Sequence, residues 1–113
     1  MKAISILLSI SVLMIFSSCA KCNNEEPTAR VLNNGSTAAN VQITASNGDI
    51  ISITELSSGL ISSVKSYSAG NASINASIDG SQLSQSLNME ECVSYDITIT
   101  SENEIVVFSQ EKD

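Results

Sequence analysis

Strict alternation of apolar and polar residues is the feature that most restricts how this chain can fold. In the segment Asn71–Asp79, every second residue is Ala or Ile, and the residues between them are Ser or Asn. The segment Val93–Thr100 repeats the pattern with Val, Tyr and Ile on one side and Ser, Asp and Thr on the other. A period of two places one face of a strand in a core and the other in water, which is typical of an antiparallel sheet.

Weaker segments of the same kind fill most of the remaining chain, and turn signals separate them. The dipeptides Asn34-Gly35, Asn47-Gly48 and Asp79-Gly80 supply the positive φ angles of tight hairpins. The predicted strands are Ala29–Asn33, Asn40–Ala45, Asp49–Glu55, Leu60–Tyr67, Asn71–Asp79, Gln82–Leu87, Val93–Ile99 and Glu104–Ser109. About seven to eight short strands at this spacing predict an all-β fold, an antiparallel immunoglobulin-like β-sandwich.

The first eighteen residues differ from the rest of the chain. After Met1-Lys2, residues 3–16 are apolar apart from three serines. A helix of this length spans about 21 Å, less than the ~30 Å hydrocarbon core of a bilayer. Residues 1–18 therefore indicate a secretory signal peptide rather than a permanent membrane span. The polar residues 19–28 follow, and we place a single β-sandwich domain at residues 29–113.

The end of the signal peptide carries a recognisable motif. Phe16-Ser17-Ser18-Cys19 resembles the lipobox of bacterial lipoproteins, in which an apolar residue and two small residues precede a cysteine. The resemblance implies cleavage before Cys19, acylation of its thiol and new amine, and a lipid anchor in the bacterial envelope, with the outer membrane as the expected location. Two or more acyl chains hold a protein stably in a bilayer. The alternative is an ordinary signal peptide cut after Ser18-Cys19-Ala20, which would release a secreted protein.

The remaining two cysteines, Cys22 and Cys92, form a natural pair if Cys19 carries lipid. In an oxidising compartment they predict a disulfide that closes a loop of about 70 residues. The alternatives are two free thiols, or a Cys22 that belongs to the tether and never meets Cys92. Two thiols without His fall short of a structural zinc set, so we predict no metal site.

Composition argues against several functional classes. The chain has no His, which removes the usual general base and every Ser-His or Cys-His nucleophile pair. Five basic against 12 acidic residues give a net charge of −7, which argues against a nucleic-acid partner. Ser62 and Lys65 match the spacing of the Ser-x-x-Lys acylation motif. Residues three apart in a strand point to opposite faces, however, so the lysine could not take the serine proton. We therefore predict no catalytic residue and no cofactor.

A second resemblance covers the predicted domain. The segments Ala29–Asn33, Asn40–Ile43, Ser66–Gly70 and Tyr95–Ile99, with Asn47-Gly48 between them, are similar to pieces of a secreted bacterial β-sandwich family of unknown function. The resemblance implies a sandwich located outside the cytoplasm. It assigns no active residue.

These observations favour a non-enzymatic, membrane-anchored lipoprotein that acts as a binding, adhesion or envelope-structural module. Its partners would be the bilayer, through acylated Cys19, and a protein or glycan.

Tyr67, near a turn, is the candidate for stacking on a sugar ring, whereas Tyr95 lies on an apolar strand face and is expected in the core. The alternative is a small inhibitor of a protease or lysozyme, with Leu56–Gly59 or Met89–Glu91 as its inserted loop.

Replacement of Cys19 by Ser tests the lipid anchor. We expect the variant to lose fatty-acid labelling and to leave the membrane fraction, because the thiol is the atom that receives the lipid. Metabolic labelling and cell fractionation measure both effects, and Ala20→Ser serves as a control that keeps the thiol. Unchanged labelling and membrane retention in Cys19→Ser would contradict the anchor.

Overall fold

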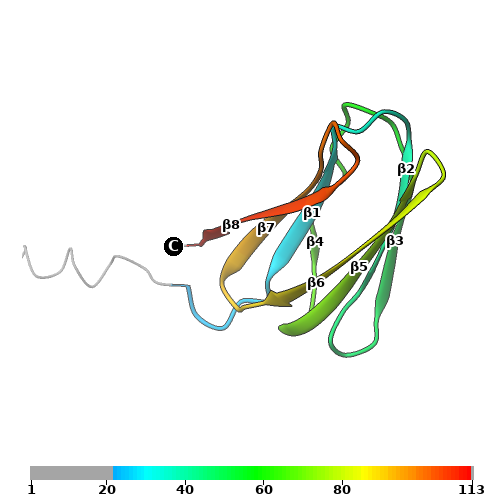
Figure 1. Cartoon of the computed structure of the whole chain (residues 1–113). Helices are drawn as coiled ribbons and strands as arrows, with labels where there is room; N and C mark the ends of the chain where they lie inside the picture. Colours follow the sequence, from blue (N-terminus) through cyan, green and yellow to red (C-terminus); the bar gives the residue numbers. More distant parts are fainter. Residues whose placement is uncertain (1–21, 113) are drawn as a thin grey trace, which may run out of the picture.

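The alternation in the sequence corresponds to eight β-strands in the computed structural model, which describes residues 22–112 (Figure 1). The predicted signal peptide and Cys19 lie outside the described residues. Among residues 22–112, no helix is long and apolar enough to cross a membrane. The strands are β1 (Thr28–Asn33), β2 (Ala39–Thr44), β3 (Ile50–Leu56), β4 (Lys65–Ser66), β5 (Gly70–Ile78), β6 (Ser81–Met89), β7 (Val93–Ile99) and β8 (Ile105–Glu111).

The strands form two four-stranded sheets that pack against each other. One sheet has the order β4-β1-β7-β8 and the other β3-β2-β5-β6, and Figure 1 shows them as two layers. The predicted all-β immunoglobulin-like sandwich is confirmed. One strand pair differs from the antiparallel prediction, because β1 and β7 run parallel from Thr28↔Ser94 to Asn33↔Ile99. Alternation reports which face of a strand is buried and carries no information on its direction or its neighbour.

The segment Leu60–Tyr67, predicted as a full strand, contains only the two-residue strand β4. The preceding residues still follow β1, since Ser62 N–H donates to the Val31 carbonyl at 2.8 Å. In return, the Val31 N–H donates to the Ser62 hydroxyl at 2.9 Å instead of to a backbone carbonyl. This substitution of a side chain for a backbone acceptor interrupts the regular ladder.

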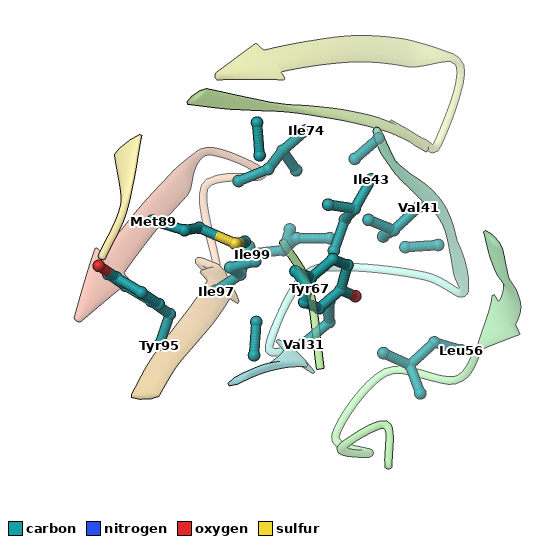
Figure 2. Packing of buried hydrophobic residues seen from close by; sticks show 14 of the residues in the cluster. Val31, Val41, Ile43, Leu56, Tyr67, Ile74, Met89, Tyr95, Ile97 and Ile99 are labelled. Carbon is teal, nitrogen blue, oxygen red and sulfur yellow. The ribbon is translucent and has the colours of Figure 1, made fainter. Parts of the chain in front are cut away.

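The core lies between the two sheets and consists mainly of Ile, Val and Ala. Figure 2 shows side chains of both sheets converging in this layer. The largest fully buried apolar side chains of the strands are Ile43, Ile74, Ile78, Met89, Ile97, Ile99 and Val31. The buried positions alternate along β2, β5 and the first part of β7 as the sequence pattern predicts. The end of β7 differs, because Thr98, expected on the exposed face, is buried at 9% exposure.

Asn33, at the end of β1, is a fully buried polar residue with a structural role. Its side-chain amide donates to the carbonyls of Thr37 at 2.9 Å and Leu56 at 2.8 Å. Its side-chain oxygen accepts the N–H of Gly35 at 2.8 Å. The amide thus ties the turn after β1 to the end of β3, and its burial is compensated by these bonds. A Cβ on Gly35 would lie 2.5 Å from Ile78 Cδ1 and 2.6 Å from Asn103 Oδ1, so a larger residue at this position would have to displace these side chains.

The polar segment before β1 is attached to the domain. Cys22 and Cys92 form the predicted disulfide, with a Cα–Cα distance of 5.7 Å. The Cys92 N–H donates to the Glu25 carbonyl at 2.9 Å, and the Tyr67 N–H donates to the carbonyl of the buried Pro27 at 2.9 Å. Residues 22–27, which we expected to belong to a tether, therefore lie along the sandwich, and the folded domain extends to Cys22.

Removal of the disulfide by the double substitution Cys22→Ser and Cys92→Ser tests its contribution to stability. The bridge joins residues 70 positions apart, and a closed loop of this size stabilises the folded state by about 4 kcal/mol in the chain-entropy model. We expect the free energy of unfolding of the mature protein, measured by urea denaturation, to fall by about this amount. Reduced wild-type protein is the control and should match the double variant, whereas an unchanged unfolding midpoint would contradict the expectation.

Candidate functional site

The outer face of the sheet β4-β1-β7-β8 contains a shallow hollow of about 260 Å³. Residues of β1, β7 and β8 line it, and Val64 closes the side next to β4. The lining residues are Thr28, Ala29, Arg30, Val64, Ser94, Tyr95, Asp96, Phe108, Ser109 and Gln110. The hollow lies on the face of the sheet that does not pack into the core.

Strand register places four side chains of this hollow in one row across the sheet. Arg30 of β1 pairs with Asp96 of β7, and Asp96 pairs with Phe108 of β8. Val64 directly precedes Lys65, which pairs with Ala29 in the antiparallel β1–β4 ladder, and it lines the same hollow as Arg30. Residues paired across strands project from the same side of a sheet. The row Val64–Arg30–Asp96–Phe108 therefore runs across the outer face.

The centre of the row is a two-point ion pair. Arg30 Nε donates to Asp96 Oδ1 at 2.9 Å, and Arg30 Nη2 donates to Asp96 Oδ2 at 3.3 Å. The hydrogen bond and the negative charge of Asp96 raise the pKa of Arg30. Both side chains are about two-fifths exposed, so the pair contributes little to stability. A guanidinium has five N–H donors, and those not used by Asp96 are available to a ligand.

The two ends of the row are apolar and open to solvent. The Phe108 side chain is 60% exposed and Val64 is 58% exposed. Arg30 and Asp96 thus present hydrogen-bonding groups between two apolar contacts. Pockets that combine apolar walls with a few oriented polar groups are typical of ligand-binding sites.

The other sheet also has a hollow on its outer face, and its chemistry is different. This hollow of about 250 Å³ is lined largely by neutral amide and hydroxyl side chains: Asn40, Gln42, Ser52, Thr54, Asn75, Ser77 and Gln82. Val41, Ile53 and Ala76 complete its lining, which contains neither an aromatic nor a charged residue. This hollow on the outer face of β3-β2-β5-β6 is therefore polar and uncharged.

Tyr67 is not on the surface, so our prediction that its ring stacks on a ligand there is wrong. The residue is 3% exposed and lies within the core in Figure 2. Its N–H bond to Pro27 fixes the backbone after β4 so that the ring points between the sheets. Burial raises the pKa of Tyr67 to about 12.

Tyr95 is buried as predicted, at 5% exposure. Its hydroxyl accepts the Glu90 N–H at 2.8 Å and donates to the Asn88 carbonyl at 3.4 Å. The hydroxyl thereby holds the connection between β6 and β7.

The exposed aromatic residue of the site is Phe108, which the sequence pattern does not distinguish from its neighbours. It ends the apolar run Ile105–Phe108, where four consecutive apolar residues hide the alternation that would reveal the exposed face. Arg30 and Asp96 each lie between apolar neighbours, so the pattern does indicate that they face outward. Their contact depends on the parallel β1–β7 pairing, which no local pattern encodes.

Ser62, the first residue of the Ser-x-x-Lys pattern, has a structural explanation. The Ser62 hydroxyl is engaged by the Val31 N–H and donates to the Ser63 carbonyl at 3.1 Å. Within the described part of the chain, no group of three or more His, Cys, Asp or Glu is arranged to hold a metal ion.

Comparisons with known proteins add evidence on the fold. A scan against protein-family models and a search of curated proteins each find no match. A solved NMR structure of a protein from Eubacterium rectale is similar, with a TM-score of 0.55 and 16% identity over 83% of this chain and 97% of that one. A crystal structure from Bacteroides ovatus ATCC 8483, described as a "putative cell adhesion protein", has a TM-score of 0.46 and 10% identity over 77% of this chain and 43% of that one. At 16% identity, the first likeness shows a shared fold and nothing about function.

The burial of Tyr67 predicts a loss of stability at high pH. An unfolded tyrosine has a pKa of about 10, and the folded value is about 12. The neutral hydroxyl is therefore favoured in the folded state, so its contribution is complete below pH 10 and is lost as pH rises through 12. By linkage, the free energy of unfolding should be about 1 kcal/mol lower at pH 11 than at pH 8 because of this residue.

The variant Tyr67→Phe isolates this effect, since it keeps the ring and removes the ionisable hydroxyl. Urea denaturation at both pH values should give a smaller decrease in the free energy of unfolding for Tyr67→Phe than for wild type. Equal decreases in the two proteins would show that Tyr67 does not titrate abnormally.

Proposed function

We propose that this protein is a lipid-anchored envelope module that binds neutral glycans in the hollow on β4-β1-β7-β8. The observation that carries the proposal is the row Val64–Arg30–Asp96–Phe108, in which an ion pair lies between two exposed apolar side chains. No residue of the row is needed in the core, and each one projects into solvent.

The chemistry of a sugar ring matches this row. One face of a pyranose is a set of C–H groups that packs on an aromatic ring such as Phe108. Each sugar hydroxyl is both a donor and an acceptor, and Arg30 and Asp96 offer donors and acceptors side by side at 2.9 Å. Thr28 and Ser94 in the next row add hydroxyl groups for a neighbouring sugar.

Charge favours a neutral ligand over an anionic one. The positive charge of Arg30 is balanced by Asp96 within the row, so the hollow has no surplus charge for a sulfate, phosphate or carboxylate. The whole chain carries a net charge of −7, which opposes the approach of polyanions.

The place of attachment limits where such a ligand is bound. If Cys19 is acylated, the disulfide at Cys22 fixes the domain only three residues after the anchor. Three extended residues span about 10 Å. The hollow would therefore stay near the membrane surface, as suits an adhesion or envelope-structural module.

The alternative function of an enzyme inhibitor has less support than glycan binding, because contacts with the sandwich hold the base of its candidate loops. Leu56 and Met89, the first residues of the two candidate loops, are buried. The Gly59 N–H donates to the Asn33 carbonyl at 2.6 Å, and the Ser58 hydroxyl donates to the Gly35 carbonyl at 2.6 Å. These contacts hold the first loop against the sandwich, so we put forward the glycan-binding function alone.

The variant Phe108→Ala tests the proposed function. We expect wild-type protein to bind a neutral oligosaccharide on a glycan array and Phe108→Ala to bind the same glycan about tenfold more weakly, because stacking on an aromatic ring contributes roughly 1–1.5 kcal/mol. NMR titration of the mature protein gives the affinities and reports whether the shifted amides belong to β1, β7 and β8.

The matched control is Ile50→Ala, which removes a similarly exposed apolar side chain from the other sheet. It should bind as wild type does. The proposal is wrong if wild type binds no neutral glycan, or if the two variants lose the same affinity.

A further inference from the structure

Strand β8 has one side that no described residue pairs with. It is the last strand in the order β4-β1-β7-β8, and it pairs with β7 in unbroken antiparallel register from Ile99↔Ile105 to Val93↔Glu111. An edge strand of seven residues exposes a row of backbone N–H and C=O groups that can pair with another strand.

Hydrogen bonds at the two ends of this ladder identify which backbone groups face outward. The Thr100 N–H donates to the Glu104 carbonyl, and the Lys112 N–H donates to the Cys92 carbonyl, both at 2.8 Å. In an antiparallel ladder the hydrogen-bonded pairs alternate with pairs that are not bonded, so residues with even numbers in β8 bond to β7. The residues whose N–H and C=O point to the open side are Ile105, Val107, Ser109 and Glu111.

The other three sheet edges have the features that usually protect an edge. Strand β4 is only two residues long, and β6 has the polar sequence SQLSQSLNM. Strand β3 has a register shift opposite Ala39–Val41 and an exposed charge at Glu55. The run Ile105–Phe108 of β8 contains no charge, proline or register shift, and unlike the polar β6 it is apolar throughout.

We propose that β8 pairs antiparallel with β8 of a second copy of this chain, about a twofold axis at Val107. In this register the outward-facing Ile105 lies opposite Ser109 of the second copy, and Val107 lies opposite Val107, so the outward backbone groups of these three residues all meet outward partners. Val106 then lies opposite Phe108 of the second copy, and this contact occurs twice. In the single chain these two side chains are 39% and 60% exposed, and a β-branched residue opposite an aromatic one is a favourable cross-strand pair.

The neighbouring registers are less favourable. Moving the axis by one residue towards the start of β8 places Phe108 opposite the charged Glu104 of the second copy. Moving it by one residue the other way places Ile105 opposite Glu111. Of these three registers, the one centred on Val107 alone gives both Val106 and Phe108 an apolar partner on the outer face.

Charge at the strand ends also fits a second copy. The register centred on Val107 places Lys112 level with Glu102 of the second copy, and Glu104 level with the neutral Gln110. No two like charges are opposite each other, although the chain is acidic overall. A strand-edge contact buries less than the roughly 1,000 Å² expected of a stable interface, so the pairing should depend on the high local concentration of chains confined to one membrane.

Disulfide trapping in the envelope tests the register directly. Two full-length copies with tags of different size are co-expressed, one with Val106→Cys and the other with Phe108→Cys. In the proposed register these two positions form a non-hydrogen-bonded pair about 4.5 Å apart between Cα atoms, which a disulfide can bridge. We expect an oxidised heterodimer on non-reducing gels, with the second Val106–Phe108 contact still intact.

Each substitution alone is the matched control. Val106 and Val106 of the second copy would be about 8 Å apart in this register, too far for a bridge, and the same holds for Phe108. Heterodimer in at least tenfold excess over either single-variant dimer supports the proposal. No heterodimer, equal amounts in all strains, or cross-linking to a protein of another mass overturns it.

A second variant tests the backbone pairing without removing an apolar side chain. Ser109→Pro deletes an N–H that faces the open side and keeps the bonds to β7, and edge strands tolerate proline at such positions. Added to both tagged copies, it should abolish the heterodimer while protease resistance remains that of wild type. Cross-linking that persists in this folded variant contradicts pairing through β8.

Discussion

The parallel pairing of β1 with β7 is the interaction on which the rest of the structure depends. These strands are more than 60 residues apart in the sequence, so no hairpin turn holds them together, and forming the pair carries the entropy cost of closing a long loop. The Cys22–Cys92 disulfide lies just before β7 and six residues before β1, at the end where both strands begin. The bond from the Cys92 N–H to the Glu25 carbonyl continues the contact upstream of Thr28. The covalent link therefore reduces the cost of the least local contact in the fold.

The opposite end of β1 is fixed by hydrogen bonds instead of a covalent bond. There the buried Asn33 side chain joins the turn after β1 to Leu56 at the end of β3, which belongs to the other sheet. The disulfide thus connects strands within one sheet, and the Asn33 amide connects the two sheets. With both ends of β1 held, Arg30 in its middle has a defined position opposite Asp96. The geometry of the candidate site therefore depends on the disulfide and the hydrogen bonds that hold the two ends of β1.

The sequence predicts those features of the structure that are determined by residues close together in the chain. Alternation locates β5 and β7 to within one residue, because burial of one face is a property of each strand alone. The Asp79-Gly80 turn is also local, and both residues have the positive φ angles that such a hairpin requires. The polar strand β6 is longer than its own pattern indicates, since β5 pairs with all nine of its residues. The burial of Tyr67 and the approach of Phe108 to Asp96 depend on contacts between distant strands. Local patterns in a single sequence do not predict such contacts.

The two proposals converge on the same face of the molecule. An antiparallel pair of edge strands has its twofold axis perpendicular to the sheet, so the outer faces of both copies point to the same side. Phe108 belongs to the row of the hollow and also to the strand at the edge, which places the two hollows of a pair next to each other. A hollow with a single aromatic contact binds a sugar weakly, but two hollows on one rigid sheet raise the effective affinity for a repeating glycan without any new contact. Pairing through β8 would therefore convert a weak binding site into one that discriminates long glycan chains from short ones.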